Sequence, residues 1–207
     1  MSVVITVAQQ KGGAGKTTLA ANLAASFAET RRVAVLDIDP QRSLTRWHGL
    51  RAARKVPAIT LSDVSGWRLE REIDRLRQSH DVLIVDSPPQ LDTDAKLAVR
   101  AAGLVLVPIQ PSPPDLWAAE GTLKLAVAEK RTARIVLNRA PNFGRLRDGV
   151  EREIKRQGYS IFSTVLGNRI GFASAFAMGL GVNEFAPRST AAVELRSLRT
   201  EIEGVLR

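Results

Sequence analysis

A run of glycines and lysines near the N-terminus carries the clearest chemical signal in the sequence. The apolar segment 3–8 is followed by Gln10-Lys11-Gly12-Gly13-Ala14-Gly15-Lys16-Thr17-Thr18. Glycines at a strand end let the backbone fold around an anion, and the N-terminus of the next helix directs further N–H groups at the same spot. A lysine in such a loop reaches the β- and γ-phosphates of a nucleotide, and the hydroxyl after it binds Mg²⁺. We therefore predict a phosphate-binding loop with Lys16 and Thr17 in these roles and a helix from Thr17.

Acidic residues follow two other apolar segments. Asp86 closes the segment 82–85, and Asp37 and Asp39 flank Ile38 after the segment 33–36. The carboxyl ends of parallel strands meet at one edge of a sheet, where ligands bind. We expect these carboxylates to lie beside the phosphate loop, although Asp37 and Asp39 also fit a simple turn at a strand end.

Apolar strands alternate with amphipathic helices along the whole chain. This alternation predicts an α/β fold with a mostly parallel sheet of about seven strands, covered by helices on both faces, in one domain over residues 1–207. The expected strands are 3–8, 33–36, 58–61, 82–86, 104–107, 134–137 and 161–165. The expected helices are 17–29, 43–53, 67–78, 93–102, 120–130, 146–157, 171–178 and 190–206, with a stiff proline-rich loop at 108–114.

Composition excludes several classes of protein. The 207 residues include no cysteine, so disulfides, thiolate metal sites and iron–sulfur clusters are excluded. No apolar run approaches the roughly 18 residues of a membrane span, and the chain passes directly from Met1 into the first expected strand. We expect a cytoplasmic protein without stable membrane insertion. Of the three tryptophans, we expect Trp67 to pack in the core or as a hydrophobic staple at the start of a helix. We also expect Trp47 and Trp117 to pack in the core, and a dimer or partner surface is the alternative for both.

The basic residues are concentrated in one region. The formal net charge is +9, and residues 124–158 hold ten basic but only four acidic residues. Such a region suits nucleic-acid phosphates or an anionic membrane face, and a merely solvated arginine-rich surface is the alternative. The candidate DNA contacts lie in and just before the helix expected at 146–157: Arg145, Arg147, Arg152, Lys155 and Arg156.

The phosphate loop departs from the ordinary spelling, because only two residues separate Gly12 from Gly15 and Lys11 precedes them. In this it resembles the ParA/MinD branch of P-loop ATPases with a deviant Walker A motif, whose signature Lys-Gly-Gly-x-Gly-Lys-Thr-Thr is matched throughout. The chain is most similar to small plasmid-type ParA proteins without an N-terminal helix-turn-helix domain. Further segments carry this resemblance: Asp39-Pro40-Gln41, 43–47, 111–115 and 190–195.

The resemblance implies roles for individual residues. Lys11 would reach the phosphates of the ATP bound by the partner in a nucleotide-sandwich dimer, as an arginine finger does. Asp39 would orient the water that attacks the γ-phosphate, Asp86 would hold Mg²⁺ through water, and Asp37 would lie in the outer shell of the metal. The residues expected to bind nucleotide are Lys11, Gly12, Gly13, Ala14, Gly15, Lys16, Thr17 and Thr18.

The base of the nucleotide is expected to be adenine. The guanine-specifying motif Asn-Lys-x-Asp is absent, because Asn138 is followed by Arg139. The resemblance points to Asn138 and Pro187 as residues that line the adenine, and turn chemistry is the alternative for both. The expected cofactors are ATP and Mg²⁺.

The resemblance implies an ATPase that dimerises with ATP and binds nucleoid DNA without sequence preference. A cargo-bound partner protein would stimulate hydrolysis, and the cargo would be a plasmid, a chromosome region or a protein assembly. Two alternatives remain. A MinD-like ATPase would use a cationic C-terminal helix on membranes, but acidic residues interleave with arginines from Glu194 to Arg207. A metabolic synthetase of the same superfamily would need a substrate pocket.

Overall fold

The computed structural model describes residues 2–64, 66–90, 92–141 and 144–207. Its centre is a parallel sheet in the order β3-β2-β4-β1-β5-β6. The strands are β1 (Val3–Val7), β2 (Val33–Asp37), β3 (Ile59–Ser62), β4 (Val82–Asp86), β5 (Leu104–Ile109) and β6 (Thr132–Leu137). The predicted α/β fold with a parallel sheet is confirmed.

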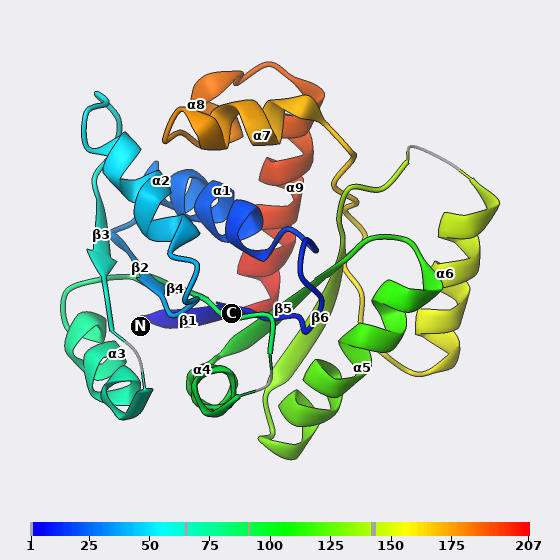
Figure 1. The fold of residues 1–207 in the computed structure, drawn as a ribbon. Helices are drawn as coiled ribbons and strands as arrows, with labels where there is room; N and C mark the ends of the chain where they lie inside the picture. The colour runs from blue at the N-terminus through cyan, green and yellow to red at the C-terminus, as the bar shows by residue number, and fades with distance from the viewer. Residues whose placement is uncertain (1, 65, 91, 142–143) are drawn as a thin grey trace.

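Helices cover both faces of this sheet (Figure 1). One layer contains α1 (Lys16–Ala28), α2 (Ser43–Arg51), α7 (Ile170–Ala177), α8 (Val182–Phe185) and α9 (Thr190–Val205). The other contains the short 3-10 turn η1 (Gly66–Arg68), α3 (Leu69–Arg77), α4 (Thr93–Ala101), α5 (Pro113–Ala128) and α6 (Arg145–Arg156).

The central strands are apolar on both sides because both faces are buried. Successive side chains of a strand point to opposite faces. In β1, Ile5 and Val7 accordingly pack with the layer that contains α1, whereas Val4 packs with α3 and α4. This arrangement places the end of β1, and the glycine-rich loop after it, at the middle of the carboxyl edge of the sheet.

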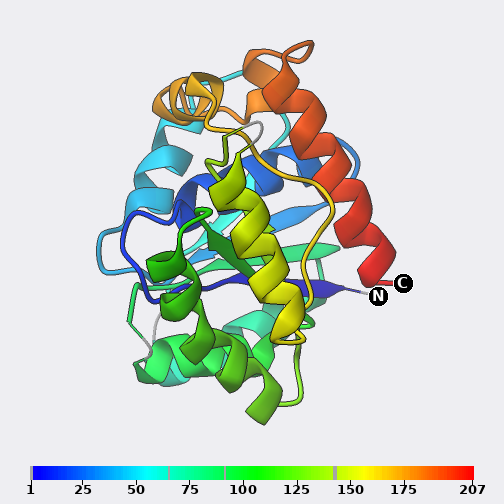
Figure 2. The ribbon, with the colours of Figure 1, turned by 90° about the vertical axis from the view of Figure 1, so that its right-hand side faces the viewer.

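The sheet has six strands rather than about seven. The segment expected to form the last strand, 161–165, makes only one isolated bridge, between Ile135 and Ile161. The Phe162 N–H still donates to the Ile135 carbonyl of β6 at 3.0 Å, but Glu201 of α9 accepts hydrogen bonds from the backbone of Ser163 and Thr164, both at 2.8 Å. The segment therefore runs beside α9 (Figure 2) and does not form a continuous ladder with β6.

Two further expectations need correction. The proline-rich loop is shorter than expected, because α5 begins at Pro113, where a missing N–H costs nothing, and Ser112 caps its N-terminus through the N–H of Asp115. Among the tryptophans, only Trp47 is in the core. Trp67 is 80% exposed and Trp117 is 66% exposed, because each lies on the outer side of its element.

A buried ion pair fastens α2 to α8. The guanidinium of Arg51 donates to both oxygens of Glu184 at 2.7 Å, and the two side chains are only 4% and 9% exposed. Glu184 also accepts the N–H of Gly181, at 2.8 Å. Arg51 lies 5.4 Å from the centre of the Trp47 ring, so the charge is enclosed on several sides.

We predict that Glu184→Gln destabilises the fold by about 3 kcal/mol, because it leaves the Arg51 guanidinium buried without its counter-charge. Urea unfolding followed by circular dichroism measures this. The matched control is Asp74→Asn, which breaks an exposed pair with Arg77 and should change the free energy of unfolding by less than about 0.5 kcal/mol. Equal effects of the two variants would contradict the prediction.

Candidate functional site: a nucleotide-binding edge

The loop between β1 and α1 has the backbone shape that its glycines allow. Gly13 has a φ of 78° and Gly15 a φ of 91°, both in the left-handed region that favours glycine. Helix α1 begins at Lys16, one residue earlier than expected, and no side chain caps its first N–H groups. These N–H groups are available to an anion.

A cavity of about 380 Å³ opens over this loop. It is lined by the loop after β1, by the segment after β2, by Pro89 after β4 and by Arg139 after β6, so it brings together residues from four strand ends. The lining residues are Gly12, Gly13, Gly15, Lys16, Thr17, Thr18, Asp39, Gln41, Pro89 and Arg139. Most of the predicted phosphate-binding residues therefore share one cavity, while Ala14 is buried behind it.

Lys16 is mostly buried at the base of the cavity. Burial lowers the pKa of its ammonium group, and the carboxylates of Asp86 and Asp39 oppose that effect. No carboxylate within the described ranges approaches Lys16 to ion-pair distance. The Lys16 ammonium group is thus partly shielded from water and has no ion-pair partner among the described residues, an arrangement that suits the binding of a phosphate.

Asp86 is fully buried at the end of β4, in register with Asp37 of β2. Neither carboxylate oxygen has a hydrogen-bond partner of ordinary geometry among the described residues. Burial raises the pKa of Asp86 to about 8, while the nearby Thr17 hydroxyl lowers it, Asp37 raises it and Lys16 lowers it. A buried carboxylate with unused oxygens fits the outer shell of a cation held by Thr17.

Asp37 and Asp39 have different surroundings, although only one residue separates them. The Oδ2 atom of Asp37 accepts both the N–H and the hydroxyl of Thr45, at 2.8 Å, so this carboxylate orients the start of α2. Among the described residues, the Asp39 carboxylate accepts one hydrogen bond, from the N–H of Gln41 at 2.9 Å, and Asp39 lines the phosphate cavity. Of the two residues, Asp39 lines this cavity and Asp37 does not.

Within the described ranges, no group of three or more histidine, cysteine, aspartate or glutamate side chains could hold a metal ion by itself. Mg²⁺ commonly takes one or two protein ligands together with water and substrate phosphates. The residues at this edge fit that mode of binding.

Asn138 holds the phosphate loop from the end of β6. Its Nδ2 atom donates to the carbonyl of Ala14 at 2.8 Å, and its Oδ1 accepts the N–H of Arg139 at 3.0 Å. A Cβ atom on Gly15 would lie only 2.4 Å from Asn138 Nδ2. Glycine is therefore required at position 15 both by its φ and by this close approach.

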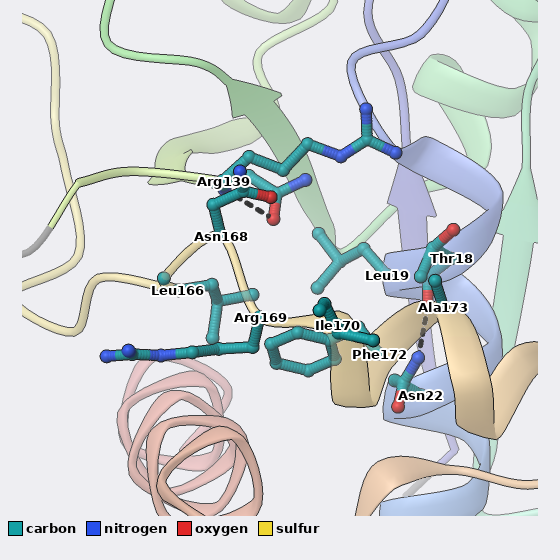
Figure 3. A pocket seen from close by; sticks show the side chains of 12 residues that line it. Thr18, Leu19, Asn22, Arg139, Leu166, Asn168, Arg169, Ile170, Phe172 and Ala173 are labelled. Carbon is teal, nitrogen blue, oxygen red and sulfur yellow. Dashed lines mark hydrogen bonds between the residues drawn. The ribbon is translucent and has the colours of Figure 1, made fainter.

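A second cavity, of about 270 Å³, adjoins the first and shares Thr18 and Arg139 with it (Figure 3). Its position beyond the phosphate loop, and its apolar side chains, suit a nucleoside. It is lined by Thr18, Leu19, Asn22, Asn138, Arg139, Leu166, Gly167, Asn168, Arg169, Ile170, Phe172 and Ala173.

Of the two residues predicted to contact the base, one lines this cavity and the other does not. Asn138 lines it, whereas Pro187 is not among its lining residues; the Pro187 carbonyl accepts a hydrogen bond from Arg196 at 3.0 Å. Residues 166–170 form one wall of this cavity. In the sequence, the feature that could have indicated this wall is the polar pair Asn168-Arg169 shortly after an apolar segment.

Lys11 is engaged within its own chain. Its Nζ lies 2.5 Å from Oδ2 of Asp115, a carboxylate that is 2% exposed and also accepts the Ser112 hydroxyl at 2.5 Å. Lys11 itself is 41% exposed. Asp115 lies in the segment 111–115 that carries the family resemblance, and no local pattern in the sequence indicates its contact with Lys11.

The five predicted DNA-binding residues do not share one face of α6. Arg145, Arg152 and Arg156, separated by seven and four residues, lie on one exposed side, with Lys155 next to them. Arg147 instead lies beside the buried side and pairs with Glu151 at 2.8 Å. Arg156 pairs with Glu153 at 2.6 Å on the surface.

We predict that Asp86→Asn raises the thermal stability of the protein without nucleotide or Mg²⁺. The pKa of Asp86 is about 8 in the folded protein and near 3.8 in the unfolded chain, so the unfolded state releases this proton first. Protonation of Asp86 therefore contributes its whole share to the free energy of unfolding below about pH 4, and this contribution is lost as the pH rises toward 8. The advantage of the variant should therefore grow across that range.

Thermal unfolding at several pH values tests this prediction, with MgATP as the second condition. MgATP should stabilise the natural protein more than Asp86→Asn, because the variant lacks the charge that supports the cation. Identical pH dependences for the two proteins would show that the Asp86 carboxylate is not desolvated as described.

Comparisons with known proteins agree with this geometry. Residues 5–182 match the family described as the CobQ/CobB/MinD/ParA nucleotide binding domain. The chain is 29% identical over 208 residues to the maintenance of carboxysome distribution protein A of Halothiobacillus neapolitanus, covering 96% of this chain and 95% of that protein. It is 30% identical over 237 residues to the chromosome-partitioning ATPase Soj of Thermus thermophilus, covering 96% and 94%.

Among solved structures, the fold is similar to apo McdA of Cyanothece, with a TM-score of 0.84, 19% identity and full coverage of both chains. At that identity the likeness concerns the fold alone. The family match, in contrast, spans most of the sequence and includes the phosphate loop, both strand-end acids and Asn138. The chain therefore belongs to the CobQ/CobB/MinD/ParA family of nucleotide-binding domains.

Proposed function

We propose that this protein is a ParA-like ATPase that positions or segregates a cargo. It would form a sandwich dimer with ATP, bind nucleoid DNA without sequence preference, and be released when a partner protein stimulates hydrolysis. The observation that carries the proposal is the cavity that the phosphate loop forms with Lys16 and Asp39. Relatives named for carboxysome distribution and chromosome partitioning match nearly the full chain, which supports positioning over a metabolic role.

The chemistry follows from how the side chains are held. Lys16 and the N–H groups at the start of α1 bind the β- and γ-phosphates, and their positive charge stabilises the transferring phosphoryl group. Thr17 and Asp86 would hold Mg²⁺, which neutralises charge on the phosphates. Asp39, with a carboxylate oriented by the N–H of Gln41, positions the attacking water and polarises it.

Lys11 would act on the partner's nucleotide. Its cis contact with Asp115 must break for the ammonium group to cross to another protomer. Hydrolysis is then slow in the monomer, where Lys11 is held by Asp115, and faster in the dimer, where it reaches a phosphate. This arrangement supports a switch that depends on assembly.

The exposed side of α6 is the proposed DNA surface. Arg145, Arg152 and Lys155 have no ion-pair partner among the described residues, and the exposed pair of Arg156 with Glu153 is weak enough to yield to a phosphate. A dimer presents two such helices, so the number of phosphate contacts doubles and the affinity rises steeply.

The MinD-like alternative lacks a supporting observation. The apolar stripe of α9, which a membrane anchor would have to expose, packs in the core through Leu195, Leu198 and Ile202. Across the described ranges, none of the helices combines the length and the apolar character needed to cross a bilayer.

We predict that Lys16→Ala abolishes ATP binding, whereas Asp39→Ala binds ATP and dimerises but hydrolyses it at least about 100-fold more slowly. The first variant loses the charge that binds phosphate, and the second loses only the group that orients water. Isothermal titration calorimetry and phosphate release distinguish them. Normal turnover by Asp39→Ala would refute the catalytic assignment.

Lys11 and Asp115 give opposite predictions. Lys11→Ala should bind ATP as a monomer but fail to form an active dimer. Asp115→Asn, which weakens the restraint on Lys11, should dimerise at a lower ATP concentration than the natural protein. Sizing by light scattering with ATP and Mg²⁺ measures both, and an unchanged ATP-dependent dimer with Lys11→Ala would exclude a trans role for this lysine.

For DNA, we predict ATP-dependent binding with no sequence preference and a log–log salt slope of about −0.9 per phosphate neutralised. Replacing Arg145, Arg152 and Lys155 by glutamate should weaken binding to all duplexes alike and leave ATP binding intact. The matched control makes the same charge change on η1 and α3, at Arg68, Arg71 and Arg77. If both triple variants lose affinity equally, net charge rather than the α6 surface determines binding.

A further inference from the structure

We propose that Glu194 of α9 is a positioning residue for the nucleoside cavity, acting through the Arg169 side chain and the Gly167 backbone. The inference rests on the proposed binding of ATP at this edge. Glu194 lies in the segment 190–195, which contributes to the ParA resemblance but lines neither cavity.

The wall formed by residues 166–170 is bonded to β6 and its continuation along one side only. The Leu166 N–H donates to the Leu137 carbonyl at 2.9 Å, and Ala140 donates to the Leu166 carbonyl at 3.0 Å and accepts the N–H of Asn168 at 3.1 Å. On its other side the segment faces α9 rather than another strand. The contacts with α9 therefore hold the side of the wall that the sheet leaves without partners.

Glu194 supplies that support with both carboxylate oxygens. One oxygen accepts the N–H of Gly167 at 3.0 Å, and the other accepts Nε and Nη2 of Arg169 at 3.2 and 2.8 Å. The carboxylate and the guanidinium are both largely shielded from solvent, which strengthens these charge-assisted bonds.

The arrangement needs close packing at Gly167. A Cβ atom on residue 167 would lie 2.6 Å from Arg169 Nε. The Arg169 side chain can pass this close to residue 167 because glycine has no side chain. Figure 3 shows that Arg169 points away from the cavity toward α9. Its guanidinium thus serves to tie the wall to Glu194 and is not directed at the nucleotide.

The phosphate end of the site has separate supports. Lys16 and Thr17 are held by α1 and by the loop, and Asp86 by β4. Loss of Glu194 should therefore release the wall beside the nucleoside and leave the phosphate-binding groups in place. This separation makes the role of Glu194 testable apart from general destabilisation.

Glu201, two helical turns further along α9, provides a matched control. It accepts three hydrogen bonds, from the backbone of Ser163 and Thr164 and from the Thr164 hydroxyl. Neither Ser163 nor Thr164 lines the cavity. Glu201 therefore anchors the same connecting segment by the same chemistry at a place remote from the nucleoside.

The experiment compares Glu194→Ala, Glu194→Gln and Glu201→Ala with the natural protein. Calorimetry measures binding of MgATP and of magnesium tripolyphosphate, which probes the phosphate end alone, and phosphate release at saturating ATP gives kcat. For Glu194→Ala we expect the Kd for MgATP to rise about tenfold, as for the loss of charge-assisted hydrogen bonds. Its tripolyphosphate affinity and its kcat should stay within about twofold of the natural values.

Glu194→Gln, which keeps one acceptor oxygen, should fall between the two proteins, and Glu201→Ala should lose thermal stability without losing ATP affinity. An unchanged Kd for MgATP with Glu194→Ala would overturn the inference and leave the proposed function intact. An equal loss of tripolyphosphate affinity would also overturn it, because the effect would then be a general distortion. If the natural protein binds neither probe, the proposed function itself fails, and this inference fails with it.

Discussion

The burial of the Asp86 carboxylate at the end of β4 is the constraint around which the functional edge is organised. An unpaired carboxylate in the core is costly, so burial raises the pKa of Asp86 to about 8, and the Thr17 hydroxyl and the Lys16 ammonium group at the start of α1 offset only part of that effect. The glycine-rich loop must bend through left-handed φ values to bring that helix to this position. The apolar strands on either side of β4 keep water away and so maintain the electrostatic contrast.

The polar residues at the neighbouring strand ends differ in how many hydrogen bonds they already make. Asp37 lies in register with Asp86, but its carboxylate is occupied by Thr45, so it fixes the start of α2. Asp39 follows two residues later, and its carboxylate accepts a single hydrogen bond among the described residues. On the other side of β1, Asn138 closes the phosphate loop from β6. At this edge, Asp37 and Asn138 use their hydrogen bonds within the protein, whereas Asp39 keeps carboxylate lone pairs available to a ligand.

Helix α9 has a larger part in the site than its distance in sequence indicates. Its apolar side packs on α1 and on the sheet, while Glu194 and Glu201 hold the segment that follows α6. These carboxylates accept the N–H groups of Ser163, Thr164 and Gly167. The wall of the nucleoside cavity is therefore bonded to α9 on one side and to the end of β6 and Ala140 on the other.

The sequence by itself determined the phosphate loop, the parallel sheet and the acids at the strand ends. These features depend on local patterns: a glycine spelling, continuous apolar runs, and an acid directly after a strand. Only the tertiary structure decided the partners of Lys11, the saturation of Asp37, the exposure of Trp67 and the wall at 166–170. Each of these depends on contacts between residues far apart in the chain, such as Lys11 with Asp115 or Arg169 with Glu194. No local periodicity encodes such contacts, because they arise only when packing brings the two segments together.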